Sequence, residues 1–138
     1  MKRYIFIALC SALLSACQND GKKANWSKAR IEMEDSAQIC LRDARAALER
    51  SDYATARSKV REIRNKYNLA LDAREEAILF MDSVDLCQAT EELQRANKEM
   101  QLHPEPHDSL KAVADELNQK IKFYLRKLEH DRQNKRTH

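Results

Sequence analysis

Helix-breaking residues are almost absent from this sequence, and their positions divide it into long uninterrupted segments. Glycine occurs once in 138 residues, at Gly21, and the two prolines stand together at Pro104 and Pro106. Alanine, leucine, glutamate, lysine and arginine, which favour helices, dominate the rest. Since no segment has the alternating apolar pattern of a β-strand, the sequence predicts an all-α fold.

The spacing of the apolar residues predicts helices at about 26–50, 53–67, 69–100 and 109–130. In each range apolar side chains recur at steps of three and four, the period of a helix with one buried face. Ser51 and Asp52 supply a turn and an N-cap candidate. Proline disfavours helix in the residue before it, so residues 102–107 form a connector. We expect one short antiparallel bundle over residues 26–134, polar and frayed after His130.

The segment 69–100 has two apolar stripes on different faces of its helix. The stripe of the first half contains Ala70, Ala73, Ala77, Phe80, Val84 and Cys87. The stripe of the second half contains Leu79, Leu86, Ala89, Leu93, Ala96 and Met100. We expect the first half to cover the first two helices. The second half should pair with the C-terminal helix through a coiled-coil-like seam of Leu110, Ala114, Leu117, Ile121, Tyr124 and Leu128.

The first 17 residues have the layout of a secretory signal. Lys2 and Arg3 precede an apolar run that is shorter than the ~20 residues needed to span a bilayer. The run ends in Leu14-Ser15-Ala16-Cys17, which resembles the lipobox of bacterial lipoproteins. The resemblance implies cleavage after Ala16 and acylation of Cys17.

Under this resemblance, residues 1–16 are a cleaved signal peptide and residues 17–25 are a lipidated flexible tether. Cleavage leaves 122 of the 138 residues and lowers the formal net charge from +3 to +1, because Lys2 and Arg3 are removed. Gln18, where some lipoproteins have aspartate, favours the bacterial outer membrane. A nearly neutral chain offers no electrostatic basis for binding nucleic acid.

Around the first predicted turn, a small residue and a leucine end one helix, and an aromatic residue and an alanine pack back. These are Ala47, Leu48, Tyr53 and Ala56, with Asp52 in the turn. The arrangement resembles a tetratricopeptide-type helical hairpin. Cys40 and Ala44 depart from it, because that family has a large aromatic residue and a glycine there. No second copy follows at an offset of about 34 residues, so we expect a single hairpin.

Two cysteines, Cys40 and Cys87, remain after lipidation of Cys17 and loss of Cys10 with the signal. In an oxidising compartment the two thiols either form a disulfide or stay free as small core residues. Counting residues along the predicted helices separates them by ~15–20 Å along the bundle axis. A disulfide needs Cα atoms within about 7 Å, so the spacing favours free thiols.

Arg57, Arg61 and Arg64, with Lys59 and Lys66, form a basic ridge on the second predicted helix. The ridge is either a solvated face or a docking surface for an acidic partner or phospholipid headgroups.

Catalytic and metal-binding patterns are lacking in the sequence. His103, Glu105 and His107 surround two prolines and are expected to form a solvated connector rather than a metal site. Asp82 and Asp85, with Glu75 and Glu76, are expected on the outer face of their helix. We predict no enzyme activity, no cofactor and no metal.

The sequence therefore favours a lipid-anchored protein of the cell envelope that acts as a non-catalytic interaction or scaffold module for an envelope protein partner. The alternative is a periplasmic chaperone or carrier that holds an apolar ligand or polypeptide between helices.

Overall fold

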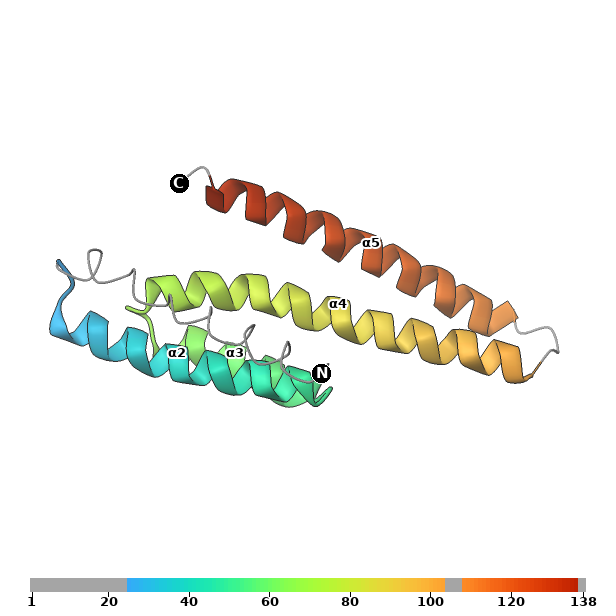
Figure 1. Ribbon diagram of the computed structural model, residues 1–138, viewed down its shortest axis with the longest axis horizontal. Coiled ribbons are helices and arrows are strands. Elements are labelled where there is room, and N and C mark those ends of the chain that lie inside the picture. Colours follow the sequence, from blue (N-terminus) through green and yellow to red (C-terminus); the bar gives the residue numbers. More distant parts are fainter. Residues whose placement is uncertain (1–24, 104–107, 137–138) are drawn as a thin grey trace, which may run out of the picture.

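The computed structural model describes residues 25–103 and 108–136, which form four α-helices and no strand. The helices are α2 (Lys28–Glu49), α3 (Tyr53–Lys66), α4 (Leu71–Leu102) and α5 (Asp108–Arg136). They pack as a short antiparallel bundle in which the long α4 contacts all three others (Figure 1). The predicted all-α fold, with a long third helix paired to a C-terminal helix, is confirmed. None of the described helices is long and apolar enough to cross a bilayer.

Side-chain caps begin α2 and α3 at the polar residues that precede them. Ser27 Oγ accepts a hydrogen bond from Arg30 N at 3.2 Å, and Asp52 Oδ1 accepts one from Thr55 N at 3.0 Å. The hydrogen bond to Thr55 lowers the pKa of Asp52. Ser51 has φ 56°, in the left-handed region, which turns the chain sharply between the two helices. Asp52 is therefore the N-cap that the sequence predicted.

The N-terminus of α4 is capped from another helix. Its own N-cap residue, Ala70, has no side chain that can accept a hydrogen bond. Instead Glu34 of α2, which is 4% exposed, accepts a hydrogen bond from Ala73 N at 2.7 Å. A carboxylate at a helix N-terminus meets unpaired N–H groups and the positive end of the helix dipole. Glu34 thereby fixes the start of α4 against α2.

The core between α2, α3 and α4 is built mainly from small side chains. The first predicted stripe of α4 faces this core, with Ala73 and Ala77 fully buried and Phe80 packed at its edge. Because alanines allow close approach, the three helices need few large side chains to exclude water. The largest fully buried side chains are Leu41, Val60, Ile63 and Val84.

The opposite face of α4 packs against α5. Ala89 and Ala96 of α4 and Ala114, Leu117 and Leu128 of α5 are buried. The pairing was predicted, but its extent was not: α5 also runs beside the first half of α4, where Lys127 contacts Asp82. In addition α5 stays helical to Arg136, so the expectation of fraying after His130 is wrong.

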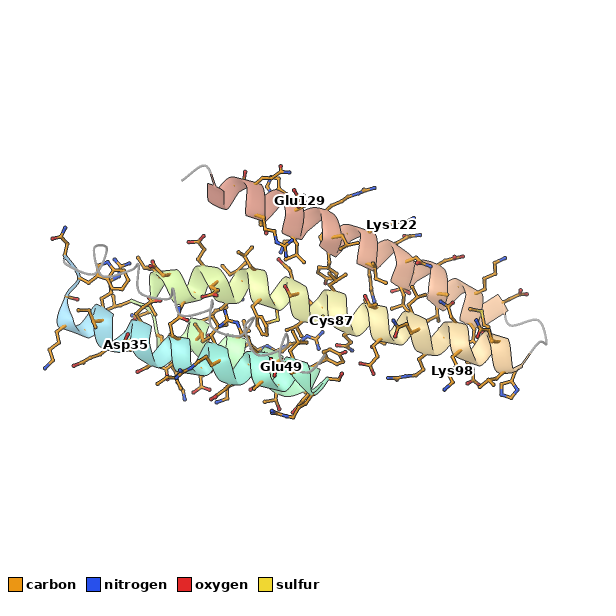
Figure 2. All side chains as sticks on the ribbon, in the orientation of Figure 1. Asp35, Glu49, Cys87, Lys98, Lys122 and Glu129 are labelled. Atoms are coloured by element: carbon orange, nitrogen blue, oxygen red, sulfur yellow. The ribbon has the colours of Figure 1, made fainter. Side chains whose placement is uncertain are left out.

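Beyond Glu91, α4 extends past the α2–α3 hairpin. The Tyr53 hydroxyl, at the start of α3, donates to Glu91 Oε2 and marks the end of that hairpin on α4. The remaining residues of α4, including the labelled Lys98, lie beside α5 only (Figures 1 and 2). The far half of the α4–α5 pair is thus a two-helix hairpin within the described residues.

Leu117→Ala should destabilise the protein far more than Leu125→Ala. Leu117 is 5% exposed in the α4–α5 seam, whereas Leu125 on the same helix is 53% exposed. We expect a loss of about 2–5 kcal/mol in unfolding free energy for Leu117→Ala and under ~0.5 kcal/mol for Leu125→Ala. Urea unfolding followed by circular dichroism measures both. Equal losses would mean that the seam is not packed as described.

Candidate interaction groove

An open groove lies beside the far half of the α4–α5 pair and has a volume of about 470 Å³. Its apolar residues come from both helices, and its charged residues form the rim. We call it the distal groove; it is lined by Glu92, Arg95, Ala96, Glu99, Leu110, Val113, Glu116, Leu117 and Lys120.

Side-chain size explains why this region is hollow. Ala96 has a short side chain and is 8% exposed, and Leu117, which lines the groove with it, is 5% exposed. The neighbouring rim residues are long and hold their charges at the edge: Lys120 Nζ lies 3.1 Å from Glu116 Oε1. This contact raises the pKa of Lys120. The groove therefore has an apolar base and a rim of mixed charge.

A smaller hollow of about 140 Å³ continues the groove toward α3 and shares Glu92 and Lys120 with it. Arg57 of α3 donates two hydrogen bonds to Asp85 Oδ1, from Nε at 3.0 Å and from Nη2 at 2.6 Å. Tyr124 of α5 lines the same hollow, and burial together with the Asp85 carboxylate raises the pKa of its hydroxyl. Side chains from three helices thus meet at Asp85.

A third hollow, of about 180 Å³, lies between α3, α4 and α5 and is lined in part by Arg64, Ile78 and Met81. Lys127 Nζ lies 2.6 Å from both carboxylate oxygens of Asp82, which is 5% exposed. The hydrogen bond to Asp82 raises the pKa of Lys127. This ion pair joins the middle of α4 to α5.

The predicted basic ridge is not one continuous solvated face. Arg57 is bound to Asp85 and half-buried, so its interpretation as part of that face is wrong. Arg61 and Arg64 are exposed, and Arg64 borders the third hollow. Lys59 and Lys66 contact Glu62 at 3.2 and 2.8 Å and hold the pKa of that carboxyl at about 2.

The surroundings of the acidic residues of α4 also differ from the prediction. Asp82 was expected on the outer face but is buried against Lys127, and Asp85 is bound by Arg57. Glu76 is half-exposed and contacts Arg45 of α2. In the described ranges no three histidine, cysteine, aspartate or glutamate side chains converge as metal ligands do.

Cys40 and Cys87 are both free thiols in the structure, in different surroundings. Cys40 is buried, and its Sγ donates a weak hydrogen bond to Lys59 O at 3.4 Å. Cys87, labelled midway along α4 in Figure 2, is exposed, so its expected place in the core is wrong. The lipidation candidate Cys17 and the connector residues Glu105 and His107 lie outside the described residues.

Sequence reasoning missed the groove and the two ion pairs that hold its inner end. A signal was present, because Asp82 lies beside the second apolar stripe of α4, and Lys127 lies one residue from Leu128 of the α5 seam. A charge of opposite sign on each of two facing seams indicates a pair across the interface.

Comparison with known proteins finds no relative: no protein-family model, curated protein or solved structure matches this chain. Functional inference therefore depends on the geometry and chemistry of its own residues.

Alkylation should distinguish the two cysteines in the native protein. The thiolate is the reactive form, and burial, followed by the Glu62 charge, raises the pKa of Cys40. We expect iodoacetamide to modify exposed Cys87 in the folded chain, and Cys40 only after unfolding. Mass spectrometry of peptides measures both. Protection of both cysteines, released by a reductant, would instead reveal a disulfide.

Proposed function

We propose that this protein is a lipid-anchored interaction module of the bacterial cell envelope, and that its distal groove binds a helix of a protein partner. The observation that carries the proposal is the extension of the α4–α5 pair beyond α2 and α3, with an open groove along it.

Packing along α4 indicates what kind of partner fits. Around Asp82 and Asp85, α4 has α5 on one face and α2 and α3 on another. Beyond Glu91 only α5 remains, and the groove runs on from the hollow that α3 borders. A partner helix in the distal groove would take the position along α4 that α3 has in the first half. Helix-in-groove binding of this kind uses one apolar stripe with charged flanks.

The charges on the rim support the same partner class. Acidic Glu92, Glu99 and Glu116 alternate with basic Arg95 and Lys120. A uniformly charged ligand would meet repulsion on this rim, whereas a helix with both signs beside its apolar stripe finds opposite charges. The exposed side chain of Val113, at 47%, gives such a helix an apolar contact at the mouth.

Binding fits the described polar residues better than catalysis does. The acids that line the groove each have a partner on their own helix: Glu92 accepts a hydrogen bond from Gln88, Glu99 contacts His103 and Glu116 contacts Lys120. A general acid or base must instead face a substrate with its proton available for transfer. We therefore propose a non-catalytic role.

The anchor rests on the sequence alone. Leu14-Ser15-Ala16-Cys17 supports acylation of Cys17, and Gln18 supports placement in the outer membrane. Acyl chains fix a protein to a bilayer without a spanning helix when two or more are present.

A carrier of apolar ligands is a second candidate, because the volume of about 470 Å³ lies within the range of ~300–1,000 Å³ for small-molecule sites. Such sites bury most of the ligand, however, and this groove is open along one side of two helices. An apolar ligand would also have to pass the charged rim.

Photo-crosslinking separates these possibilities and tests the groove. A photoreactive phenylalanine analogue at Val113 should give a discrete protein adduct in intact cells, because Val113 lines the groove. The same analogue at Leu125, similarly exposed on α5 but outside the groove, is the matched control.

We expect the adduct from position 113 only. A co-expressed copy that carries Val113→Glu should not reduce this adduct, because the carboxylate prevents that copy from binding the partner. Burial of the Val113 side chain by the partner contributes ~1.5 kcal/mol to the binding free energy, so Val113→Glu should weaken partner binding at least tenfold. Equal protein adducts from positions 113 and 125, or none from either, would contradict a groove-bound partner.

A further inference from the structure

Exposed apolar residues gather at the end of the bundle where α2 and α4 begin. Leu69 is 41% exposed and Leu71 is 54% exposed, although Ala70 between them is fully buried. Trp26, just before α2, is partly exposed. The fold does not account for this exposure, because Tyr67 and Ala70 supply the turn's contacts with the core.

One arginine joins these segments into a single surface. The Arg30 guanidinium lies 4.0 Å from the centroid of the Trp26 ring, and its Nη2 lies 3.4 Å from Asp72 Oδ1 at the start of α4. The cation over the ring orients Trp26 beside the α3–α4 turn. We call Trp26, Leu69 and Leu71 the apolar end.

Basic side chains surround the apolar end. The Lys28 side chain is 91% exposed and the Lys66 side chain is 66% exposed; each contacts an acid on its own helix, Glu32 and Glu62. An ammonium group has three N–H donors, so both lysines can bind phosphate oxygens in addition to their acidic neighbours. The C-terminal end of α5, with exposed Arg132, lies at the same end of the molecule (Figure 1).

The chain that precedes residue 25 joins the bundle at this end, because Ser27 caps α2. Eight peptide units separate Cys17 from Asn25, which allows a reach of at most about 28 Å. If Cys17 is acylated, as the proposed function requires, the apolar end stays within that distance of the bilayer.

We propose that the apolar end docks on the surface of a phospholipid bilayer. Trp26 lies at the depth that tryptophan prefers at membrane interfaces, Leu69 and Leu71 enter the boundary of the acyl chains, and Lys28 and Lys66 meet headgroup phosphates. With docking, two parts of the protein contact the membrane: the acyl chains on Cys17 and the apolar end. Since α4 is about 48 Å long and its far end is opposite, the distal groove is held away from the membrane.

Trp26 reports this contact directly, because it is the only tryptophan in the sequence. The full chain, expressed in a bacterium and purified in detergent, is reconstituted into vesicles of phosphatidylethanolamine and phosphatidylglycerol with brominated acyl chains. We expect a blue-shifted Trp26 emission that the bromine atoms quench.

The double variant Leu69→Gln/Leu71→Gln should lose most of this quenching. Leu102→Gln is the matched control, because Leu102 is 62% exposed at the far end of α4 and should leave it unchanged. Quenching that persists in the double variant would come from the tether alone and would overturn the docking surface.

The intact mass of the same preparation separates this inference from the proposed anchor. Acyl groups on Cys17 without quenching of Trp26 would overturn docking and leave the lipid anchor in place. A chain without acyl groups would overturn the anchor and, with it, the docking that depends on it.

Discussion

The ion pair between Asp82 and Lys127 sets the position of α5 along α4, and the groove depends on that position. The other buried residues of the α4–α5 seam are alanines and leucines, so neighbouring alignments would bury similar surfaces. Asp82 is 5% exposed, and a shift of one turn would leave its charge buried without a partner. Loss of the pair would cost Lys127 much less free energy, because its side chain is 40% exposed and water can solvate the ammonium group. The pair therefore acts as a register device, as buried polar residues do in coiled coils.

α4 can serve two interfaces because its small residues lie on opposite faces. Ala73 and Ala77 admit α2 and α3, whereas Ala89 and Ala96 admit α5. Glu34 caps α4 from α2, which fixes the start of the long helix, and Asp82 fixes α5 upon it. The two ends of α4 consequently differ: one lies in a complete bundle beside the apolar end, and the other has a single helical neighbour and an open groove. This division is consistent with the proposed arrangement, in which the bundle lies at the membrane and the distal groove projects away from it.

Much of the fold was predictable because helix propensity and apolar period are local properties. The four segments, the Asp52 cap and the change of face along α4 were all read from spacing. What spacing does not give is the partner of a charged residue. Arg57 looks solvated on a helical wheel, and Asp82 lies only beside an apolar stripe. The approach of α4 to Arg57 and of α5 to Asp82 turns both residues into members of ion pairs. Cys87 shows the reverse error: it continues an apolar stripe, but α2 and α3 end near its level and leave it exposed. The groove was missed for a related reason, since it depends on where the α2–α3 hairpin stops.

A double-mutant cycle on Asp82 and Lys127, measured by urea unfolding, tests the central claim that this pair holds α5 on α4. Lys127→Met alone should cost about 3–5 kcal/mol, because it leaves a buried carboxylate unpaired. Adding Asp82→Leu should recover much of that loss, with a coupling energy of at least ~1 kcal/mol. Losses that simply add, with no coupling between the two substitutions, would contradict the account.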